Sequence, residues 1–454
     1  MSDDTELDAI VEPPPLAVEA SDAGAVVPPP PPLPAPRLDL AALDEISRAD
    51  PALFEDRRAD PPFARQVMTT PLHFYVASES LTNLWRNWNG YTVADQLTNL
   101  DDEYAALRHG AALTDISPLV KYRISGPDAL AWLRRLVTGN LVSLSVDEVT
   151  PVVFCEDRGL VVGDGLLFRL GDSEFRLITE ERHLAWFLDS AIGHNVRIED
   201  VSATLAAMSL QGPLSCAVLS DAGFSGIENL RPYTAHWFNV TGMPVYVSRS
   251  GNSGDLGYEL WVDPDDAPAF WLRLLDKGKM HGVKAGGFAL REIARIEAGI
   301  PCAGVDYLGA FSAIDPQSAL TPFELGFSAL VDLNGEHFTG REALRKAKAQ
   351  PPRYILATLA VDWSAPLTFG AIRDASGVAG IATSTGFSPA LGINLALATL
   401  RPSAIADGAV LHVQAELREE LALRVISAAA RIVAGPALLL PARHLVPAPL
   451  VARR

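Results

Sequence analysis

The sequence predicts an α+β protein whose C-terminal part forms an all-β barrel. Helix-like and strand-like stretches alternate from about residue 70, whereas the segments after residue 350 have strand character and lack long helical periods. Hydrophobic residues make up 48% of the 454 residues and charged residues 20%, which is typical of folded globular proteins. At roughly 100–200 residues per domain, this length predicts about two to four domains.

Residues 1–50 differ from the rest in composition and are predicted to form a disordered acidic tail. They hold 11 acidic and 2 basic residues, and ten prolines lie between Pro13 and Pro36. Such a segment buries too little apolar surface to offset the entropy of ordering its backbone. A ligand for a proline-recognising partner is the alternative interpretation of this tail.

Residues 70–348 are predicted to form one domain of two related α+β halves. A glycine ends the first expected helix at Gly110, and the turn Gly126-Pro127 precedes the second one. The turn Gly171-Asp172 separates two strand-like runs and predicts a hairpin. The expected elements are helix 102–110, strand 120–125, helix 128–136, hairpin 159–170 with 174–178, strand 206–211, helix 213–219, strands 244–248 and 258–262, and helix 267–278.

The last hundred residues are predicted to form a separate β-barrel domain, residues 350–454. A short helix after Gly340 runs into Gln350-Pro351-Pro352, where the composition changes, so we expect a domain boundary near residue 350. The strand candidates beyond it are residues 354–361, 379–383 and 395–399. Several short strands without intervening helices are typical of a barrel or roll.

Charge and hydropathy narrow the classes of partner. The formal net charge of −18 leaves no general basic surface for nucleic acid, whose non-specific binding depends on neutralising phosphates. No apolar run approaches the roughly 20 residues that span a bilayer, and the acidic start lacks the positive flank of a signal peptide. We therefore expect a cytoplasmic protein without nucleic-acid or membrane partners.

Cysteine and histidine give no sign of a metal. Cys155, Cys216 and Cys302 are widely separated and form no C-x-x-C pair, and no two histidines have the spacing of ligands on one helix. Free cysteines usually pack as small hydrophobic residues. We expect three buried thiols and no bound metal.

Three glycine-punctuated clusters are candidates for chemistry. Residues 250–260 form a loop whose three glycines permit close backbone approach, which suits either a ligand or an ordinary hairpin. Residues 289–301 predict an amphipathic helix with Arg291 and Arg295 four residues apart. Two like charges on one helix face call for anions, either nearby glutamates or a bound carboxylate, unless that face is solvated. Residues 321–327 alone would be interpreted as a turn.

Taken together, these clusters resemble the folate-binding T-protein of the glycine cleavage system and its relatives, which include tetrahydrofolate-dependent demethylases. The resemblance covers about residues 73–400. Its motifs, in order, are the glycine-rich loop from Ser250 to Glu259, R-x-x-x-R-x-E-A-G from Arg291 to Gly299, T-P-x-E-x-G from Thr321 to Gly326, and F-x-G-R-E-A-L from Phe338 to Leu344. The last is the family's S-x-G-x-F-S-P-x-L-G, which reads T-S-T-G-F-S-P-A-L-G from Thr383 to Gly392 in this chain.

The resemblance implies that tetrahydrofolate lies in a central hole between domains. Glu259 matches the glutamate that grips the pterin, and a carboxylate suits the pterin edge because it accepts two parallel N–H donors. Arg291 matches the arginine that serves the folate carbonyl or glutamate carboxylates. Tyr258 is expected to shape the ring slot or to pack in the core. Trp88 and Tyr91 lie where the family places substrate-facing residues, with core packing as their alternative.

One departure from the family pattern concerns the candidate catalytic residue, Asn140. It stands where the T-protein has the aspartate that lies near the folate N10. A neutral amide orients a reacting nitrogen by hydrogen bonds but neither accepts a proton nor stabilises a cation as a carboxylate does. A second departure places Asn252 where the family loop usually has tyrosine.

The resemblance and its departures together predict a tetrahydrofolate-dependent C1 transferase that moves a methyl group from an O-, S- or N-methyl donor to tetrahydrofolate. The alternative within the family is the aminomethyltransferase of glycine cleavage, which needs a lipoyl carrier protein as partner. From another class comes a non-catalytic folate-binding regulator. The regulator relatives carry a K-G-C-Y-x-G-Q-E signature, and residues 298–306 lack it.

Overall fold

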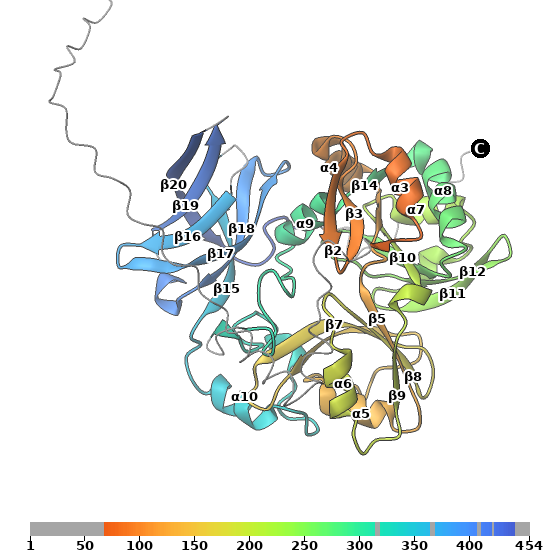
Figure 1. Cartoon of the computed structure of the whole chain (residues 1–454), viewed down its shortest axis with the longest axis horizontal. Helices are drawn as coiled ribbons and strands as arrows, with labels where there is room; N and C mark the ends of the chain where they lie inside the picture. Colours follow the sequence, from red (N-terminus) through yellow and green to blue (C-terminus); the bar gives the residue numbers. More distant parts are fainter. Residues whose placement is uncertain (1–67, 314–317, 364–367, 406–409, 420–421, 441–454) are drawn as a thin grey trace, which may run out of the picture. The chain divides into compact units, whose positions relative to one another are not determined.

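The computed structural model describes residues 68–313, 318–363, 368–405, 410–419 and 422–440, all within one compact unit, Val67–Arg454. Within this unit lie three open sheets and a closed barrel (Figure 1). This mixture of α and β structure with a C-terminal barrel confirms the predicted fold class. The expectation for residues 1–50 falls outside the described residues.

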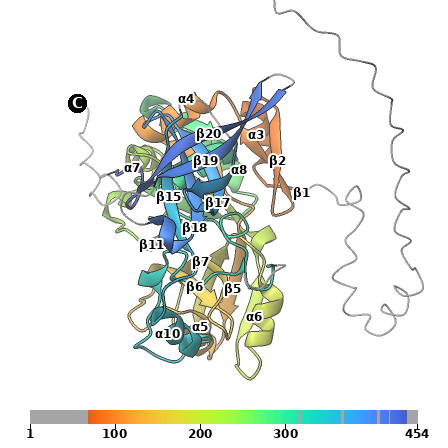
Figure 2. The same ribbon diagram turned by 90° about the vertical axis from the view of Figure 1, so that its left-hand side faces the viewer.

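The five-stranded sheet is antiparallel, in the order β6-β7-β8-β5-β9. Helices α5 and α6 lie beside it (Figure 2), and their apolar side chains share one core with its strands, including Trp132 and Phe187. The hairpin predicted across Gly171-Asp172 is confirmed as β7–β8. The elements are β5 Val120–Ser125, α5 Ala129–Leu136, β6 Val149–Cys155, β7 Val161–Arg169, β8 Glu174–Thr179, α6 Leu184–Ser190 and β9 Arg197–Asp200.

The six-stranded sheet has the order β11-β12-β13-β10-β4-β14, with only its β14–β4 pair parallel. Its central strands β10 and β13 are buried along their whole length. The elements are β4 Ala112–Asp115, β10 Ala206–Gln211, α7 Ser215–Asp221, β11 Ala235–Val240, β12 Met243–Ser248, β13 Gly257–Val262, α8 Ala267–Gly278 and β14 Lys284–Gly286.

A small three-stranded sheet precedes these two in sequence, and a tight turn joins two of its strands, β2 and β3. Its strands are β1 Met68–Thr69, β2 Leu84–Trp88 and β3 Tyr91–Gln96, with α3 His73–Glu79 between β1 and β2. The turn residues Asn89 and Gly90 both have positive φ, +52° and +87°, as expected for an Asn-Gly hairpin turn. Helix α4, Leu100–His109, follows, and it starts two residues before the predicted helix because Asn99 caps it through a 3.0 Å bond from the Asp101 amide.

The barrel closes in the order β15-β18-β17-β16-β19-β20 and has an apolar interior that includes Leu359, Ala398 and Val413. Its strands are β15 Ile355–Val361, β16 Thr368–Asp374, β17 Gly377–Ser388, β18 Ile393–Leu400, β19 Leu411–Glu419 and β20 Ala422–Val433, preceded by α10 Arg341–Lys348. Strands 354–361, 379–383 and 395–399 were predicted, and the second is the middle of a longer strand. The domain boundary near residue 350 stays a prediction, as do the two related halves before it.

Helix α9, Phe288–Glu297, connects these parts. It contacts strand β17 of the barrel on one side and β3 of the small sheet on another, and Figure 1 shows it between them. None of the described helices is long and apolar enough to cross a membrane. Within the described ranges, no three His, Cys, Asp or Glu side chains are grouped to hold a metal ion.

Candidate functional site

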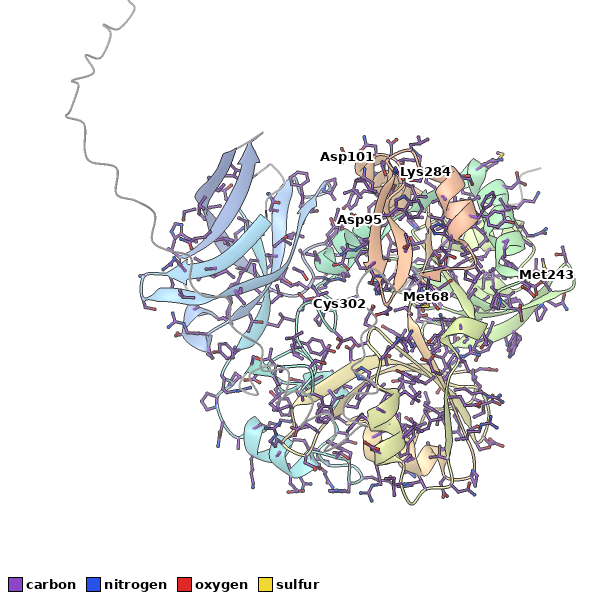
Figure 3. The ribbon with its side chains drawn as sticks, in the orientation of Figure 1. Met68, Asp95, Asp101, Met243, Lys284 and Cys302 are labelled. Atoms are coloured by element: carbon purple, nitrogen blue, oxygen red, sulfur yellow. The ribbon has the colours of Figure 1, made fainter. Side chains whose placement is uncertain are left out.

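A cavity of about 300 Å³ lies among the five-stranded sheet, the six-stranded sheet and helix α9. Its walls are largely apolar, with side chains such as Leu166, Ile178 and Leu290. Cys302 also lines it, and Figure 3 shows the labelled Cys302 between the barrel and the two larger sheets. The charged side chains in the wall are Asp164, Glu180, Glu259, Arg291 and Arg295. The cavity is therefore a largely apolar pocket with a few charged groups, the usual character of a small-molecule site.

Glu259 reaches the cavity from the central strand β13 and is only 8% exposed. Its Oε2 accepts a 2.6 Å hydrogen bond from the Ser250 hydroxyl. Burial raises the pKa of Glu259, an effect that Ser250 and the charge of Arg291 oppose. Among the described residues, no side chain donates a hydrogen bond to its Oε1. One carboxylate oxygen thus stays available to a ligand.

The glycine-rich loop before β13 wraps around the side chain of Gln211. Gln211 Nε2 donates to the Ser250 carbonyl at 3.1 Å, and Ser253 donates to Gln211 Oε1 at 2.8 Å. A Cβ atom at Gly251 or Gly257 would come within 2.1 Å or 2.0 Å of Gln211 atoms. These two glycines are needed because the loop closes over a buried amide. The same loop carries Ser250, which holds Glu259 in place.

Arg291 projects from α9 into the cavity, where its Nη2 pairs with Glu180. Its guanidinium stacks 4.8 Å from the ring centre of Trp88. The Nη1 atom is buried and makes no hydrogen bond within the described part of the chain, and it lies 3.7 Å from Glu292 Oε1. Nearby Glu180 and Glu292 help keep the pKa of Arg291 above its usual value despite burial. Arg291 is therefore held in one orientation and retains a donor without a hydrogen bond.

Glu180 is held from the opposite side by the Asn89-Gly90 turn. The Asn89 side chain donates to the Glu180 carbonyl at 2.8 Å and to the Pro118 carbonyl at 3.0 Å. Asn89 has the positive φ that asparagine tolerates better than most residues. The turn of the small sheet thus fixes the backbone of the residue that pairs with Arg291.

Arg295, one helical turn further on, lines the cavity but has no free donors directed at a ligand. It is 1% exposed, and it bonds to Asp306 at 2.8 Å and to the Ser384 hydroxyl at 2.7 Å. Glu292 takes two further bonds, at 2.9 Å and 2.6 Å, and the Ile300 carbonyl takes one at 3.1 Å. The solvated interpretation of this helix face is wrong, because both arginines are buried and paired with carboxylates.

An acidic group lies at another part of the cavity wall. Asp164 comes from β7 and accepts a hydrogen bond from the Tyr307 hydroxyl. Burial raises the pKa of Asp164 to about 7, and the nearby charges of Glu180 and Glu181 act in the same direction. The Oε2 atom of Glu181 is itself buried without a hydrogen-bond partner within the described ranges. This wall therefore holds a carboxyl group that changes protonation near neutral pH.

Tyr258, Trp88 and Tyr91 do not line this cavity. Tyr258 directly precedes Glu259 on β13, and successive side chains of a strand point to opposite faces. Tyr258 therefore points away from the cavity and is 0% exposed in the core with residues of α7 and α8. Trp88 and Tyr91 are buried in a second core with Phe288. All three side chains therefore pack in the core, the alternative expected for each of them. Trp88 keeps one link to the cavity through its contact with Arg291.

Asn140 lies outside the cavity, in the exposed loop between α5 and β6. Its Nδ2 is 3.3 Å from Asp332 Oδ2, and its Oδ1 accepts a 2.9 Å bond from the Val142 amide. The loop beyond Asp332 contacts the same segment, since the Asp332 amide donates to the Thr138 carbonyl at 2.9 Å. The amide of Asn140 therefore organises a loop, and no contact joins it to Glu259 or Arg291.

Sequence reasoning missed Asp164, Glu180 and Gln211 as cavity residues, and it missed Tyr307, whose hydroxyl donates to Asp164. Asp164 lies between two glycines on a strand, and Glu180 directly follows a strand, positions where a charged residue next to a buried run is a usable signal. Gln211 and Tyr307 carry no such signal. All three cysteines are buried thiols, as predicted, and burial raises the pKa of the Cys302 thiol well above its usual range.

The remaining motifs of the resemblance hold the fold around the cavity. Glu324 of the T-P-x-E-x-G motif accepts hydrogen bonds from Arg353 and from the Thr321 amide and hydroxyl. Ser388 of the last motif donates to Glu297 on α9 at 2.5 Å. Ser388 therefore ties the barrel to α9, and Glu324 ties its own segment to Arg353, just before the barrel.

The comparisons with known proteins agree with this arrangement. The family model described as the GCVT N-terminal domain matches residues 74–334. An aminomethyltransferase from Lysinibacillus sphaericus is 30% identical over 286 residues, which are 62% of this chain and 76% of that relative. A trimethylamine-oxide aldolase from Ruegeria pomeroyi is 30% identical over 353 residues, 74% of this chain and 44% of the relative.

A solved structure shares the fold. The glycine cleavage system aminomethyltransferase T from Bartonella henselae superposes with a TM-score of 0.71 at 23% identity, covering 82% of this chain and 99% of that one. The family model alone covers more than half of the 454 residues. The chain therefore belongs to the glycine cleavage T-protein family of aminomethyltransferases, as its motifs indicated.

Proposed function

We propose that this protein is a tetrahydrofolate-dependent C1 transferase that moves a methyl group from an O-, S- or N-methyl donor to tetrahydrofolate. Membership of the T-protein family supports the class of reaction. The observation that carries the proposal is Glu259, a buried carboxylate in a ligand-sized cavity with one oxygen not hydrogen-bonded by a described side chain. Such a group is unfavourable unless a ligand supplies hydrogen-bond donors.

The cavity fits a folate ring in size and chemistry. Its volume of about 300 Å³ is at the lower end of the range for small-molecule sites. Glu259 would accept the two parallel N–H donors of a pterin edge, and the free Nη1 of Arg291 would donate to a carbonyl or carboxylate oxygen. Leu166, Ile178 and Leu290 offer apolar walls for a flat ring.

Bound tetrahydrofolate would supply a nucleophilic nitrogen that accepts the one-carbon group. The residues of this chain would contribute orientation: Glu259 and Arg291 fix a ligand through charged hydrogen bonds, and the apolar wall excludes water. Holding two reactants in line is worth roughly 7–11 kcal/mol of the barrier. These roles suit methyl transfer, which depends more on the alignment of the two reactants than on a strongly basic side chain.

Two observations favour a methyl donor over an aminomethyl donor. Asn140, at the position where the family pattern has an aspartate, is a neutral amide that donates to Asp332 and accepts from the Val142 amide. In addition, the relative from Ruegeria pomeroyi is named for trimethylamine oxide, an N-methyl compound. Methylated amines are therefore among the first donors to test.

Calorimetric titration with tetrahydrofolate tests the proposal. Glu259→Ala is expected to weaken binding by roughly 1.5–3 kcal/mol, the range for hydrogen bonds to a charged group, with the fold intact. Glu174→Ala is the matched control, because this glutamate of β8 is 40% exposed and pairs with Arg123 on the surface. Equal affinity in the wild type and Glu259→Ala would refute the assignment of the pterin site.

The aminomethyltransferase of glycine cleavage remains the second candidate, because several relatives carry that name. It would use a lipoyl carrier protein. If this candidate is correct, Asn140→Asp should raise aminomethyl transfer from the carrier by about 10²–10⁴-fold, the usual effect of a positioned proton-transfer group. Under the methyl-transfer proposal the same variant has unchanged or lower activity with methyl donors. Both assays on both proteins separate the candidates.

A further inference from the structure

Asp164 is a cavity carboxyl group that forms no ion pair with a cation within the described part of the chain. Arg291 pairs with Glu180, and Arg295 pairs with Glu292 and Asp306. Asp164 instead accepts a hydrogen bond from a neutral hydroxyl, that of Tyr307. A buried carboxylate with only a neutral partner costs free energy, so its position in a cavity wall calls for a role beyond packing.

The ionisable groups that face Asp164 come from several elements. Tyr307 approaches from the loop after α9, and Glu180 and Glu181 approach from the end of β8. Across the cavity lie Glu259 and Arg291, and Cys302 lies near Tyr307. The two glutamates disfavour a further negative charge, whereas the Tyr307 hydroxyl favours it.

We propose that Asp164, oriented by Tyr307, is the group that accepts a proton from the bound acceptor nitrogen during one-carbon transfer. This inference rests on the proposed function and adds a catalytic residue to it. Asn140 cannot serve this purpose, because its side chain is an amide and lies outside the cavity. Asp164 supplies within the cavity the carboxylate that position 140 lacks.

The proton balance of methyl transfer requires such a group. The lone pair of the acceptor N–H nitrogen forms the new N–C bond, and the bond between the methyl carbon and the donor heteroatom breaks with its electron pair staying on the donor. The nitrogen then carries one proton too many, and the Asp164 carboxylate takes it. From there the proton passes to solvent, or to the leaving atom where that atom is an oxyanion or thiolate. No oxidant or reductant is needed.

The protonation of Asp164 itself is measured first, in the ligand-free protein. Carboxyl carbon NMR should show Asp164 titrating near pH 7, because burial raises its pKa to about 7. Tyr307→Phe removes the donor that favours the charged form and should raise this pKa by on the order of one unit. Glu181→Gln removes a like charge and should lower it. Titration near the ordinary aspartate value of about 4 would overturn the proposal.

Turnover is then measured against pH. A base must be ionised to accept a proton, so wild-type turnover should rise with pH through about 7. The rise should move to higher pH in Tyr307→Phe and to lower pH in Glu181→Gln. Asp164→Asn should reduce turnover about 10²–10⁴-fold and remove the rise. A purely structural role would leave the midpoint of the profile unchanged in all three variants.

Binding separates this inference from the proposed function. Similar tetrahydrofolate affinity in wild type and Asp164→Asn, together with the same dependence of turnover on pH in both proteins, would refute the role of Asp164. That result would leave the proposed function standing. If the wild type does not bind tetrahydrofolate, the proposed function itself fails.

Discussion

Arg291 and Arg295 lie one turn apart on the same helix, yet their surroundings differ. Arg295 is enclosed by oxygen acceptors from α9, the loop after it and the barrel. Arg291 pairs with Glu180 and lies 3.7 Å from a second carboxylate, Glu292. It also has a stacked aromatic ring and a buried nitrogen that makes no hydrogen bond within the described residues. The comparison shows that equal helical spacing gave one arginine a complete structural network and left the other with a donor nitrogen that makes no hydrogen bond within the described residues.

The network around Arg295 joins two family motifs that are far apart in sequence. Asp306 accepts hydrogen bonds from Arg295 and from the hydroxyls of Thr383 and Ser384 on β17. A buried charge is tolerable only when each of its partners is present. The motif of α9 and the motif of β17 are therefore two halves of one buried network.

The largest effect is expected from Arg295→Met. The variant removes the cation of Asp306 and leaves Glu292 with Arg291 at 3.7 Å. Breaking a buried pair such as Arg295–Asp306 costs about 3–5 kcal/mol of unfolding free energy. Urea unfolding of the full chain measures it. Arg345→Met is the control, since its pair with Glu342 is exposed and worth about 0–1 kcal/mol. Similar losses in the two variants would contradict the structural role of Arg295.

Arg291→Met should affect ligand binding more than stability, the reverse of Arg295→Met. Glu180 lines the cavity and keeps access to water, so the loss of stability should be smaller than for Arg295→Met. Tetrahydrofolate binding should instead weaken by about 1.5–3 kcal/mol, the value of hydrogen bonds to charged groups. Calorimetry and urea unfolding on the same preparation compare the two quantities. A destabilised protein with normal folate affinity would show that Arg291, too, is structural.

Trp88 should matter through Arg291 and to a lesser degree. Its ring carries the guanidinium at 4.8 Å, and such contacts are worth roughly 0.5–2 kcal/mol. Trp88→Leu should therefore weaken folate binding by about 2–30-fold, and Trp88→Phe should restore most of it. If Trp88 contacts the methyl donor, as the sequence suggested, the donor KM will rise and folate affinity will stay unchanged.

The smallest effect concerns Glu259 and pH. Burial raises the pKa of Glu259 in the folded state above its pKa in the unfolded state. The contribution of this carboxyl to the free energy of unfolding is therefore fully present below the unfolded-state pKa, and it is lost as pH rises through the folded-state pKa. Glu259→Gln lacks this titration, so its stability relative to wild type should improve with increasing pH. Urea unfolding across a pH series, with Glu174→Gln as the exposed control, measures the trend. A constant difference across the series would mean that the carboxyl is not perturbed.

Strand alternation explains why Tyr258 packs in the core, one of the two positions expected for it. Tyr258 and Glu259 are adjacent on β13, and successive strand side chains point to opposite faces, so only one of them can reach the cavity. The sequence contained this information once residues 258–262 were predicted as a strand. Trp88 is a different case, since its neighbour Arg291 is about 200 residues away and no local pattern joins them.

The sequence by itself determined the family and the α+β class with its C-terminal barrel, because these follow from local motifs and residue chemistry. It also selected Glu259 and Arg291, both of which line the cavity. Only the tertiary structure decided which charges meet. Asp164 on β7 meets Tyr307, and Glu180 meets Arg291, through contacts between elements more than a hundred residues apart. Burial and neighbouring charge set the protonation of such groups, and both depend on how the sheets and α9 close around the cavity.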